Sequence, residues 1–350
     1  MTARSARPPN LEDVAARAGV SRATVSRVVN EHATVAPQLR ERVRRAVEEL
    51  GYVPNQAARS LMTRRSDSIA MVASEPDQRV FGDPFFSGIL RGVSQEATAA
   101  GLQVVLMMAQ SWEDLERVKR FLRSAPVDGV MLISEHATAD PLPEMLERAG
   151  IPLVVGGRPM QANAHPLFVN YDNVGGARAA VRHLADRGRR VIGTITGPLD
   201  MSAGLDRLQG FRAALGAQFD LERSEVGDFS AAGGEAAMTR LLERVPDLDG
   251  VFAASDLMAI GALAALRRAG RRVPEDVAIV GFDDNEFAAT AEPPLTTMRQ
   301  DPWLLGRLMV RLYVAHHRPD LELEPVDGLP EVAGVEHVIL PAELVVRESS

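Results

Sequence analysis

The 350-residue chain contains no cysteine, and this absence removes several chemistries at once. Without thiols there is no disulfide framework, no thiolate metal site and no cysteine nucleophile, and a reducing compartment fits best. No apolar run approaches the roughly 18 residues that span a bilayer, and none follows the Arg- and Pro-rich N-terminus as in a secretory signal. We therefore expect a cytoplasmic protein that is neither secreted nor inserted in a membrane.

Catalytic motifs are missing as well. The sequence has no GxSxG elbow, no GxxxxGK[ST] phosphate loop and no HExxH pair. The seven histidines are scattered, and His316 and His317 face different directions on a predicted helix. Asp283, Asp284 and Glu286 form a carboxylate cluster, so an α/β hydrolytic enzyme remains the least favoured alternative. We expect no enzyme activity, no cofactor and no metal.

Positive charge is concentrated at the start of the chain. Residues 1–65 carry twelve Arg, no Lys and six acidic residues, a net charge of +6, whereas the whole chain carries −8 and the remainder therefore −14. A basic head favours binding to a phosphate backbone, and an acidic body restrains indiscriminate binding.

Residues 11–30, LEDVAARAGVSRATVSRVVN, predict two short helices joined by a tight turn. Asn10 and Asp13 have the types and spacing of a capping box, and Gly19 supplies the left-handed backbone that ends the first helix. Ser21 then caps the second helix. At about 100° per residue, the valines of this helix fall on one side and its polar residues on the other.

The free side of the second helix carries Arg22, Ala23, Ser26, Arg27 and Asn30. This arrangement indicates a helix-turn-helix, whose second helix enters the major groove and meets base edges with its first residues. Arg22 lies where base contact is expected, and the planar fork of Arg27 suits a guanine edge or a phosphate. A surface helical hairpin with solvated arginines is the alternative.

A third helix is predicted from Pro37 to Leu50. With it, residues 10–54 form a three-helix head behind a disordered arm at residues 1–9. Residues 55–67 form a predicted hinge helix and linker, in which a helix of barely two turns cannot hold alone in water. Bound DNA and a symmetry mate would stabilise it, and an ordinary linker is the alternative.

From Ser68 on, short apolar runs alternate with amphipathic helices, which predicts parallel sheets covered by helices. Residues 127–135 resemble residues 248–256, and each stretch is followed by a helix, Arg-Ala-Gly and another apolar strand. Two similar lobes are therefore expected. We assign 68–167 plus 298–326 to the first lobe and 168–297 plus 327–350 to the second. Ligands bind beyond the carboxyl ends of parallel strands, so two facing lobes define a cleft.

Four separated motifs, DVAARAGVSRATVSRVVN, LGYVPNQAARSL, PLTTMRQD and LVVRESS, resemble the LacI/GalR family of bacterial transcription regulators over nearly the whole chain. The resemblance implies an all-α head, a hinge helix whose leucine, here Leu61, inserts at the operator centre, and a periplasmic-binding-protein-like core that binds an effector and dimerises. Ala36 departs from the family, which usually has a capping Ser there. The candidate DNA contacts are Ser21, Arg22, Ala23, Thr24, Ser26, Arg27, Asn30, Asn55, Ala58 and Leu61.

The resemblance also implies an effector-binding arginine at Arg207, an aspartate at Asp283 and a polar contact at Gln300. An Arg with a carboxylate suits the vicinal hydroxyls of a sugar or the edge of a nucleobase, and a buried ion pair is the structural alternative. Ser255 stands where the family commonly has Asn, so one donor is lost. The other candidates near strand ends or helix starts are Asp256, Phe85, Phe86, Arg158 and Trp303.

Together these features predict a sequence-specific transcriptional regulator, a repressor by family precedent, that binds a near-palindromic double-stranded operator under control of an effector, most consistently a sugar. No heptad-bearing tail follows residues 343–346, so we expect a homodimer. Effector binding would change the orientation of the lobes and decide whether the hinge helices form. A stand-alone sugar-binding protein is the alternative for residues 68–350, against which the attached head argues.

Overall fold

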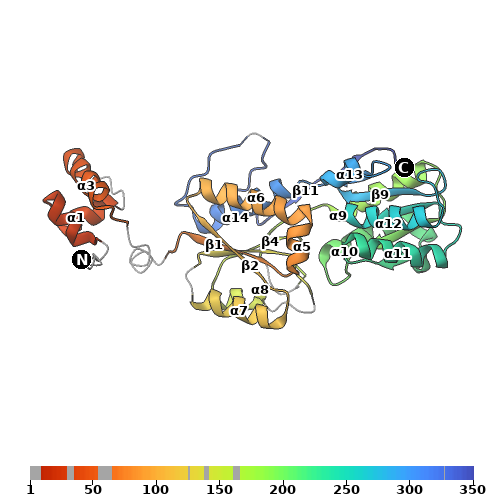
Figure 1. Ribbon diagram of the computed structural model, residues 1–350, viewed down its shortest axis with the longest axis horizontal. Helices are drawn as coiled ribbons and strands as arrows, with labels where there is room; N and C mark the ends of the chain where they lie inside the picture. The colour runs from red at the N-terminus through yellow and green to blue at the C-terminus, as the bar shows by residue number, and fades with distance from the viewer. Residues whose placement is uncertain are drawn as a thin grey trace, which may run out of the picture. The chain divides into compact units, whose positions relative to one another are not determined.

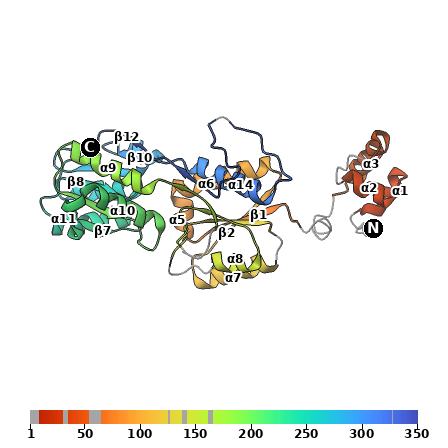
Figure 2. The same cartoon turned by 180° about the vertical axis from the view of Figure 1, so that it is seen from behind.

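The computed structural model describes residues 9–29, 35–53, 65–124, 127–137, 142–160, 166–326 and 328–350. The chain divides into two compact units, Met1–Ser66 and Asp67–Ser350. Figure 1 shows both units, and Figure 2 shows them from behind.

The described residues of the first unit form three helices, α1 (Leu11–Ala18), α2 (Arg22–Val29) and α3 (Pro37–Leu50). The predicted capping box is confirmed: the Asn10 side chain accepts from the Asp13 amide at 3.0 Å, and Asp13 Oδ2 accepts from the Asn10 amide at 2.9 Å. Gly19 ends α1 with a φ of 63°. Val14, Val25 and Val43 are fully buried, so the helices pack on their apolar stripes as predicted.

The cap of α2 is the predicted one, because Ser21 Oγ accepts from the Thr24 amide at 3.1 Å. The start of α3 has no such bond, since Ala36 offers no side-chain acceptor. Four of the candidate DNA contacts lie outside the described residues, namely Asn30, Asn55, Ala58 and Leu61.

The second unit contains two six-stranded sheets. The first, in the order β11-β5-β4-β3-β1-β2, is parallel throughout. Its strands are β1 (Ser68–Ala73), β2 (Gln103–Met108), β3 (Gly129–Ile133), β4 (Leu153–Gly156), β5 (Leu167–Tyr171) and β11 (His337–Leu340). The second sheet has the order β12-β10-β9-β8-β6-β7, and β12 alone runs antiparallel. Its strands are β6 (Ile192–Thr196), β7 (Ser224–Val226), β8 (Gly250–Ala253), β9 (Ala278–Asp283), β10 (Thr296–Arg299) and β12 (Glu343–Val345).

Helices cover both faces of each sheet, as Figure 1 shows for the first lobe. There, one face packs on α6 (Pro84–Ala99) and α14 (Pro302–His317), next to the short α5 (Asp77–Gly82), and the other face on α7 (Trp112–Ser124) and α8 (Leu142–Ala149). The second sheet lies between α9 (Asn173–Asp186) with α10 (Ser202–Leu215) and α11 (Ala231–Arg244) with α12 (Asp256–Arg268). The short elements α13 (Glu286–Thr290), η1 (Gly216–Gln218) and η2 (Leu221–Arg223) complete this lobe. The predicted architecture of two parallel-sheet lobes is thus confirmed.

The predicted lobe boundaries need correction. Residues 168–171 belong to β5 and therefore to the first sheet, residues 298–299 belong to β10 in the second, and residues 337–340 form β11 in the first. The physical reason is that strand partners are chosen by long-range pairing, which local apolar patterns do not encode. The chain consequently crosses between the lobes three times, after β5, after β10 and between β11 and β12.

Candidate functional site

The exposed side of α2 forms the candidate nucleic-acid interface. Val25 and Val28 are buried against α1 and α3, which turns the arginines outward. The Arg22 side chain is 69% exposed, and its Nη1 lies 3.7 Å from Glu12 Oε1. An ion pair this long and this exposed contributes little to stability. Arg27 is exposed one turn later. Both guanidinium groups are therefore available to acceptors on DNA.

A second candidate site is a small cavity of about 60 Å³ between the lobes of the second unit. Side chains at the carboxyl ends of strands from both sheets line it. They include Phe85, Glu135 and Arg158 from the first lobe and Asn173, Arg207 and Gln300 from the second lobe and the crossovers. The position agrees with the rule that open parallel sheets bind ligands at this edge.

Arg207 is the central cation of this cavity, and its surroundings fix its orientation. The residue is 4% exposed. Nε donates to Asn173 Oδ1 at 2.8 Å, Nη1 donates to the Ala254 carbonyl, and the guanidinium carbon lies 3.7 Å from the centre of the Phe282 ring. Burial lowers the pKa of Arg207, but a guanidinium stays charged because its ordinary pKa is so high. The Arg207 side chain is already fixed in one orientation, so ligand binding need not reduce its conformational entropy further.

Asp283 provides the acceptor beside this cation. Its Oδ1 lies 3.6 Å from Arg207 Nη1 and accepts from Gln300 Nε2 at 2.5 Å. The register of β9 against β10 pairs Asp283 with Arg299, which brings Gln300 alongside. Burial raises the pKa of Asp283 to about 7, while the charge of Arg207 and the bond from Gln300 oppose the shift. This carboxyl therefore titrates near neutrality.

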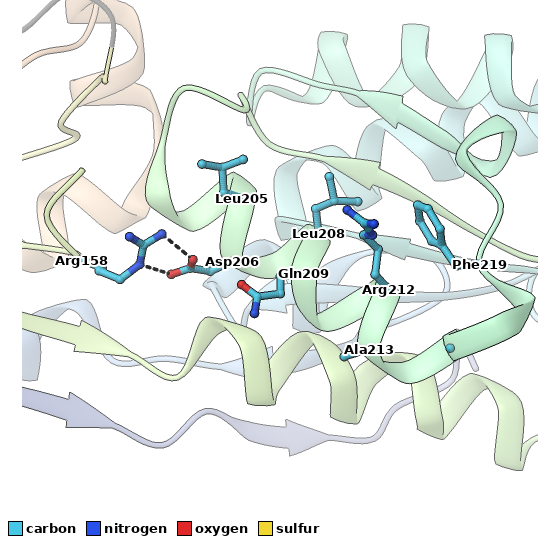
Figure 3. A pocket seen from close by; sticks show the side chains of 9 residues that line it. Arg158, Leu205, Asp206, Leu208, Gln209, Arg212, Ala213 and Phe219 are labelled. Carbon is cyan, nitrogen blue, oxygen red and sulfur yellow. Dashed lines mark hydrogen bonds and ion pairs between the residues drawn. The ribbon is translucent and has the colours of Figure 1, made fainter. Parts of the chain in front are cut away.

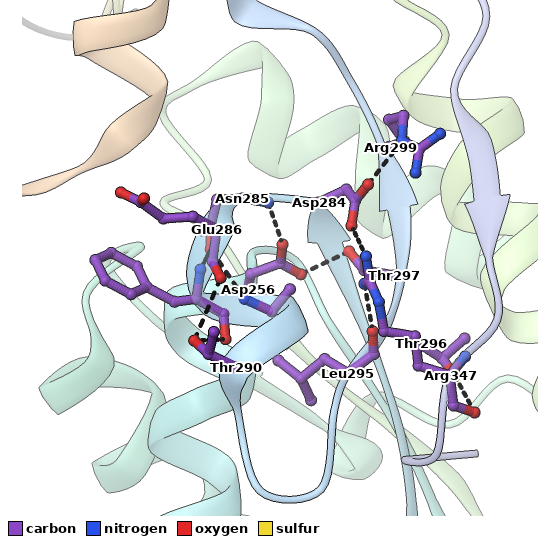
Figure 4. A network of polar contacts seen from close by, with 12 residues as sticks. Asp256, Asp284, Asn285, Glu286, Thr290, Leu295, Thr296, Thr297, Arg299 and Arg347 are labelled. Carbon is purple, nitrogen blue, oxygen red and sulfur yellow. Dashed lines mark hydrogen bonds and ion pairs between the residues drawn. The ribbon is translucent and has the colours of Figure 1, made fainter.

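The backbone at this point is strained. Asp283 and Asp284 have φ values of 123° and 56°, which side chains larger than glycine rarely adopt. Asp284 accepts from Arg299 Nε at 2.6 Å and from Arg347 Nη2 at 2.5 Å, as Figure 4 shows. Such bonds hold the turn in its strained conformation and keep Asp283 beside Arg207, next to the cavity and not among its lining residues.

Ser255 and Asp256 lie behind the cavity and do not line it. Ser255 caps α12 by accepting from the Met258 amide at 3.2 Å. Asp256 is fully buried and accepts from the Asn285 amide at 3.0 Å and from the Thr297 hydroxyl at 2.6 Å (Figure 4). Ser255 therefore stabilises the start of α12, and Asp256 supports the turn after β9.

The remaining candidates divide between the cavity and the helix packing. Phe85 lines the cavity, whereas Phe86 is 2% exposed in the core of the first lobe. Trp303 packs on α6, where its Nε1 donates to Gln95 Oε1 at 3.0 Å. Neither Phe86 nor Trp303 is among the lining residues, because both lie on the helix faces that pack together.

Arg158 is engaged across the cleft. Its Nε and Nη2 donate to the two carboxylate oxygens of Asp206 at 3.0 and 2.7 Å, a bidentate pair from the loop after β4 to α10. Figure 3 shows this pair at one end of a shallow pocket along α10. Arg158 therefore joins the lobes instead of standing free for an anionic ligand.

His136 makes a second connection between the lobes. Its Nδ1 lies 2.8 Å from Asp200 Oδ2 in the second lobe, and its Nε2 lies 3.4 Å from Glu75 Oε1 in the first. Glu75 also pairs with Arg79. The bond to Glu75 raises the pKa of His136 most, burial opposes it, and Asp200 adds to the rise. The charged imidazolium is thus favoured where the lobes meet.

Sequence reasoning missed Asn173, Glu135 and Asp206. Asn173 lies just after β5, as Asp283 lies at the end of β9, so the signal of a polar residue at a strand end was present here too. It was missed because residues 167–171 were not predicted to form a strand. Glu135 and Asp206 become part of the site through contact between the lobes, which no local pattern encodes. Among the described residues, no group of His, Asp and Glu could hold a metal ion, and no helix is long and apolar enough to cross a membrane.

A helix-turn-helix with outward arginines and a two-lobed core with a polar cleft define a DNA-binding regulator that responds to a ligand. Residues 10–55 match the family described as bacterial regulatory proteins, lacI family, and residues 181–350 match the periplasmic binding protein-like domain. The chain belongs to the lacI family of bacterial regulatory proteins, and the predicted family and regulatory function are confirmed.

Three similar proteins illustrate this membership. The HTH-type transcriptional regulator CelR of Thermobifida fusca is 49% identical over 347 residues, 98% of each chain. A solved structure described as a transcriptional regulator CelR-cellobiose complex has 47% identity and a TM-score of 0.75, covering 98% of this chain and 100% of that one. The lac repressor dimer bound to operator and the anti-inducer ONPF has 29% identity and a TM-score of 0.83, covering 98% and 99%.

Proposed function

We propose that the chain is a homodimeric repressor whose affinity for a near-palindromic operator is set by a sugar bound between its core lobes, with cellobiose as the first candidate. The observation that carries this proposal is the group of Arg207, Asp283 and Gln300 at the meeting edge of the two sheets. The similar CelR–cellobiose complex supports the choice of ligand.

The chemistry of the cleft fits a sugar. Arg207 is a fixed fork of donors, and Asp283 offers carboxylate oxygens beside it, an arrangement that matches two neighbouring hydroxyls. Phe85 adds an aromatic face for the apolar face of a sugar ring. The cavity of about 60 Å³ is smaller than the sites that usually hold ligands, so the lobes must part for a ring to enter. Ligand binding is thereby tied to lobe orientation.

At the operator, Arg22 and Arg27 on the exposed side of α2 would contact base edges in the major groove. The other proposed contacts in this helix and its cap are Ser21, Ala23, Thr24 and Ser26. Effector binding would change the lobe orientation, which across a dimer sets the spacing of the hinges and hence the affinity for DNA.

We also propose that the chain catalyses no reaction. The carboxylate cluster that favoured a hydrolase does not offer two free groups, because Asp284 is held by Arg299 and Arg347. Asp283 is bonded by Gln300 and lies beside Arg207. Retaining and inverting glycosidases need two carboxyl groups that are open to substrate.

The proposal is tested with the full-length protein and an operator obtained by selection from random DNA. Cellobiose should change the dissociation constant for operator, measured by fluorescence anisotropy, by roughly 5- to 150-fold, the usual range of allosteric coupling. Arg207→Lys should weaken cellobiose binding in calorimetry at least tenfold, because an ammonium cannot reproduce the planar fork.

The matched control is Arg212→Lys, on the same helix over the Phe219 ring and outside the cavity, which should leave the affinity for cellobiose unchanged. An operator affinity that ignores millimolar cellobiose, or equal effects of the two substitutions, would contradict the proposed function.

A further inference from the structure

A larger chamber of about 390 Å³ opens beside the inner cavity, between the start of α6 and the turn from β9 to α13. The chamber and the cavity share two lining residues, Phe85 and Gln300. The chamber is within the size range of ligand sites, and the inner cavity is not. A ligand that reaches Arg207 therefore has room to extend outward past Phe85 and Gln300.

The chamber presents hydrogen-bonding groups that the fold leaves unused. Asp83 is 9% exposed, and its Oδ1 caps α6 by accepting from the Phe85 amide at 3.0 Å. Its other oxygen bonds to no described residue. Asn285 caps α13 with its side-chain oxygen, which accepts from the Phe287 and Ala288 amides at 3.0 and 3.3 Å.

This cap commits the oxygen of the Asn285 amide to α13. The nitrogen Nδ2 is buried without a hydrogen-bond partner among the described residues, and Asn285 is one of the residues that line the chamber. A buried donor without an acceptor costs about 1–3 kcal/mol, so such groups call for an explanation. A ligand hydroxyl in the chamber would satisfy this donor.

The charges around the chamber restrict the kind of ligand. Asp83, Asp283, Asp284, Glu286 and Asp301 all line it, and Arg91 is the single lining cation among the described residues. An anionic ligand such as a sugar phosphate would be repelled by this excess of carboxyl groups. A neutral molecule with many hydroxyl groups can donate to the carboxylates and accept from Asn285 and Arg91.

We propose that the outer chamber is the subsite for the second ring of a neutral disaccharide, with Asp83, Asn285 and Arg91 binding its hydroxyl groups. The inference rests on the proposed function, because it takes the first ring to lie against Arg207. The outer chamber then distinguishes a disaccharide from the monosaccharide it contains. Ligand length, and not only ring stereochemistry, sets the response of the regulator.

The test compares cellobiose with glucose in calorimetric titrations of the full-length protein. Wild type should bind glucose at least tenfold more weakly than cellobiose. Asn285→Asp keeps an oxygen that can cap α13 and replaces the donor by a carboxylate oxygen, and it should weaken cellobiose at least tenfold while changing the glucose affinity less than twofold. Arg91→Met should weaken cellobiose about threefold or more, again without affecting glucose.

Arg120→Met is the matched control, since Arg120 is an exposed arginine on α7, on the opposite face of the same lobe, and no loss of either sugar is expected. If wild type binds cellobiose but Asn285→Asp and Arg91→Met bind it normally, or lose both sugars equally, the subsite is wrong while the proposed function stands. If wild type binds neither sugar, the proposed function fails and the subsite with it. Thermal melts of each variant establish that it is folded.

Discussion

Asp256 lies one layer behind the cleft, where it is completely buried at the start of α12. Its two oxygens accept from the Thr297 hydroxyl and the Asn285 amide, and so connect β10 to the turn that carries Asp283. Burial raises the pKa of Asp256 well above its ordinary value, and the two bonds oppose that rise. The geometry of the ligand site thus depends on a residue that does not line it.

Asp256→Ala should lower the free energy of unfolding by roughly 2–5 kcal/mol, because it strips two buried donors of their acceptor. Thr297→Val, which removes one of the two bonds, should cost about 1–2 kcal/mol. Urea unfolding of the full-length protein measures both. Glu343→Ala at an exposed position of β12 is the control and should stay within about 0.5 kcal/mol of wild type. A similarly small effect of Asp256→Ala would refute the supporting role.

Single residues differ in how far the sequence predicts their place. Arg207, Asp283 and Gln300 could be predicted because each lies in a recognisable motif next to a strand or helix. Phe86 and Trp303 could not be separated from Phe85 by type, since which face of α6 or α14 enters the cleft depends on how these helices pack. The unused donor of Asn285 becomes visible only once its oxygen is seen to cap α13.

At the level of elements, α6 and α14 approach each other closely through glycines. A Cβ atom added at Gly92 would lie 2.1 Å from the Trp303 carbonyl oxygen, and one at Gly306 would lie 2.3 Å from the Ile89 carbonyl oxygen. These contacts leave no room for a methyl group. Asp83 and Asp301 cap α6 and α14, and both residues also line the outer chamber. The two closely packed helices therefore also form part of the chamber wall.

Gly92→Ala should therefore destabilise the protein by about 1–3 kcal/mol, because the helices must move apart or shift. Gly82→Ala is the matched substitution in a helix whose added Cβ would meet nothing within 4 Å, and it should be neutral or slightly stabilising. Thermal unfolding of the two variants separates the cases. Equal melting temperatures of the two variants would show that α6 and α14 can move apart without a loss of stability.

Elements with strong local signals were predicted closely, and those defined by their partners were not. The predicted bounds of α3 agree with the structure, because its apolar pattern and the flanking Pro37 and Gly51 are local. For β5, β10 and β11 the sequence does not show which sheet each strand joins, since that choice is made by neighbours far along the chain.

At the scale of the whole second unit, the pairs Arg158–Asp206 and His136–Asp200 join the lobes through their side chains. They differ in their response to pH. Arg158 stays charged throughout the physiological range, whereas His136 has an ordinary pKa of 6.5 that its contacts with Glu75 and Asp200 raise. Stability from a raised histidine pKa is fully present below 6.5 and is lost as the pH rises through the raised value.

Lobe closure should consequently weaken as the pH rises above 6.5 and through the raised pKa of His136. The cysteine-free chain allows spin labels at Gln78→Cys in α5 and Leu221→Cys in η2, both exposed positions on different lobes. Electron–electron distance measurements should show one short population at pH 5.5 and longer distances at pH 8.5. The expected effect of His136→Gln is to remove this dependence, which separates it from the titration of Asp283 near pH 7.

Arg158→Gln is the control for this experiment, because it should lengthen the distances equally at both pH values. A pH dependence that survives in His136→Gln would assign the effect to another group.

The interleaved crossovers also set the order in which the protein can assemble during synthesis. Residues 68–171 leave the ribosome early, but α14, which covers their sheet, and β11, which forms its edge, are made only after residue 301. The second lobe receives all but β12 before that point. The first lobe therefore waits for α14 and β11 until most of the chain has been made, although its translation began first. Until then α6 alone covers the sheet face that α14 later shares, and the uncovered part of that face depends on chaperones or on rapid elongation.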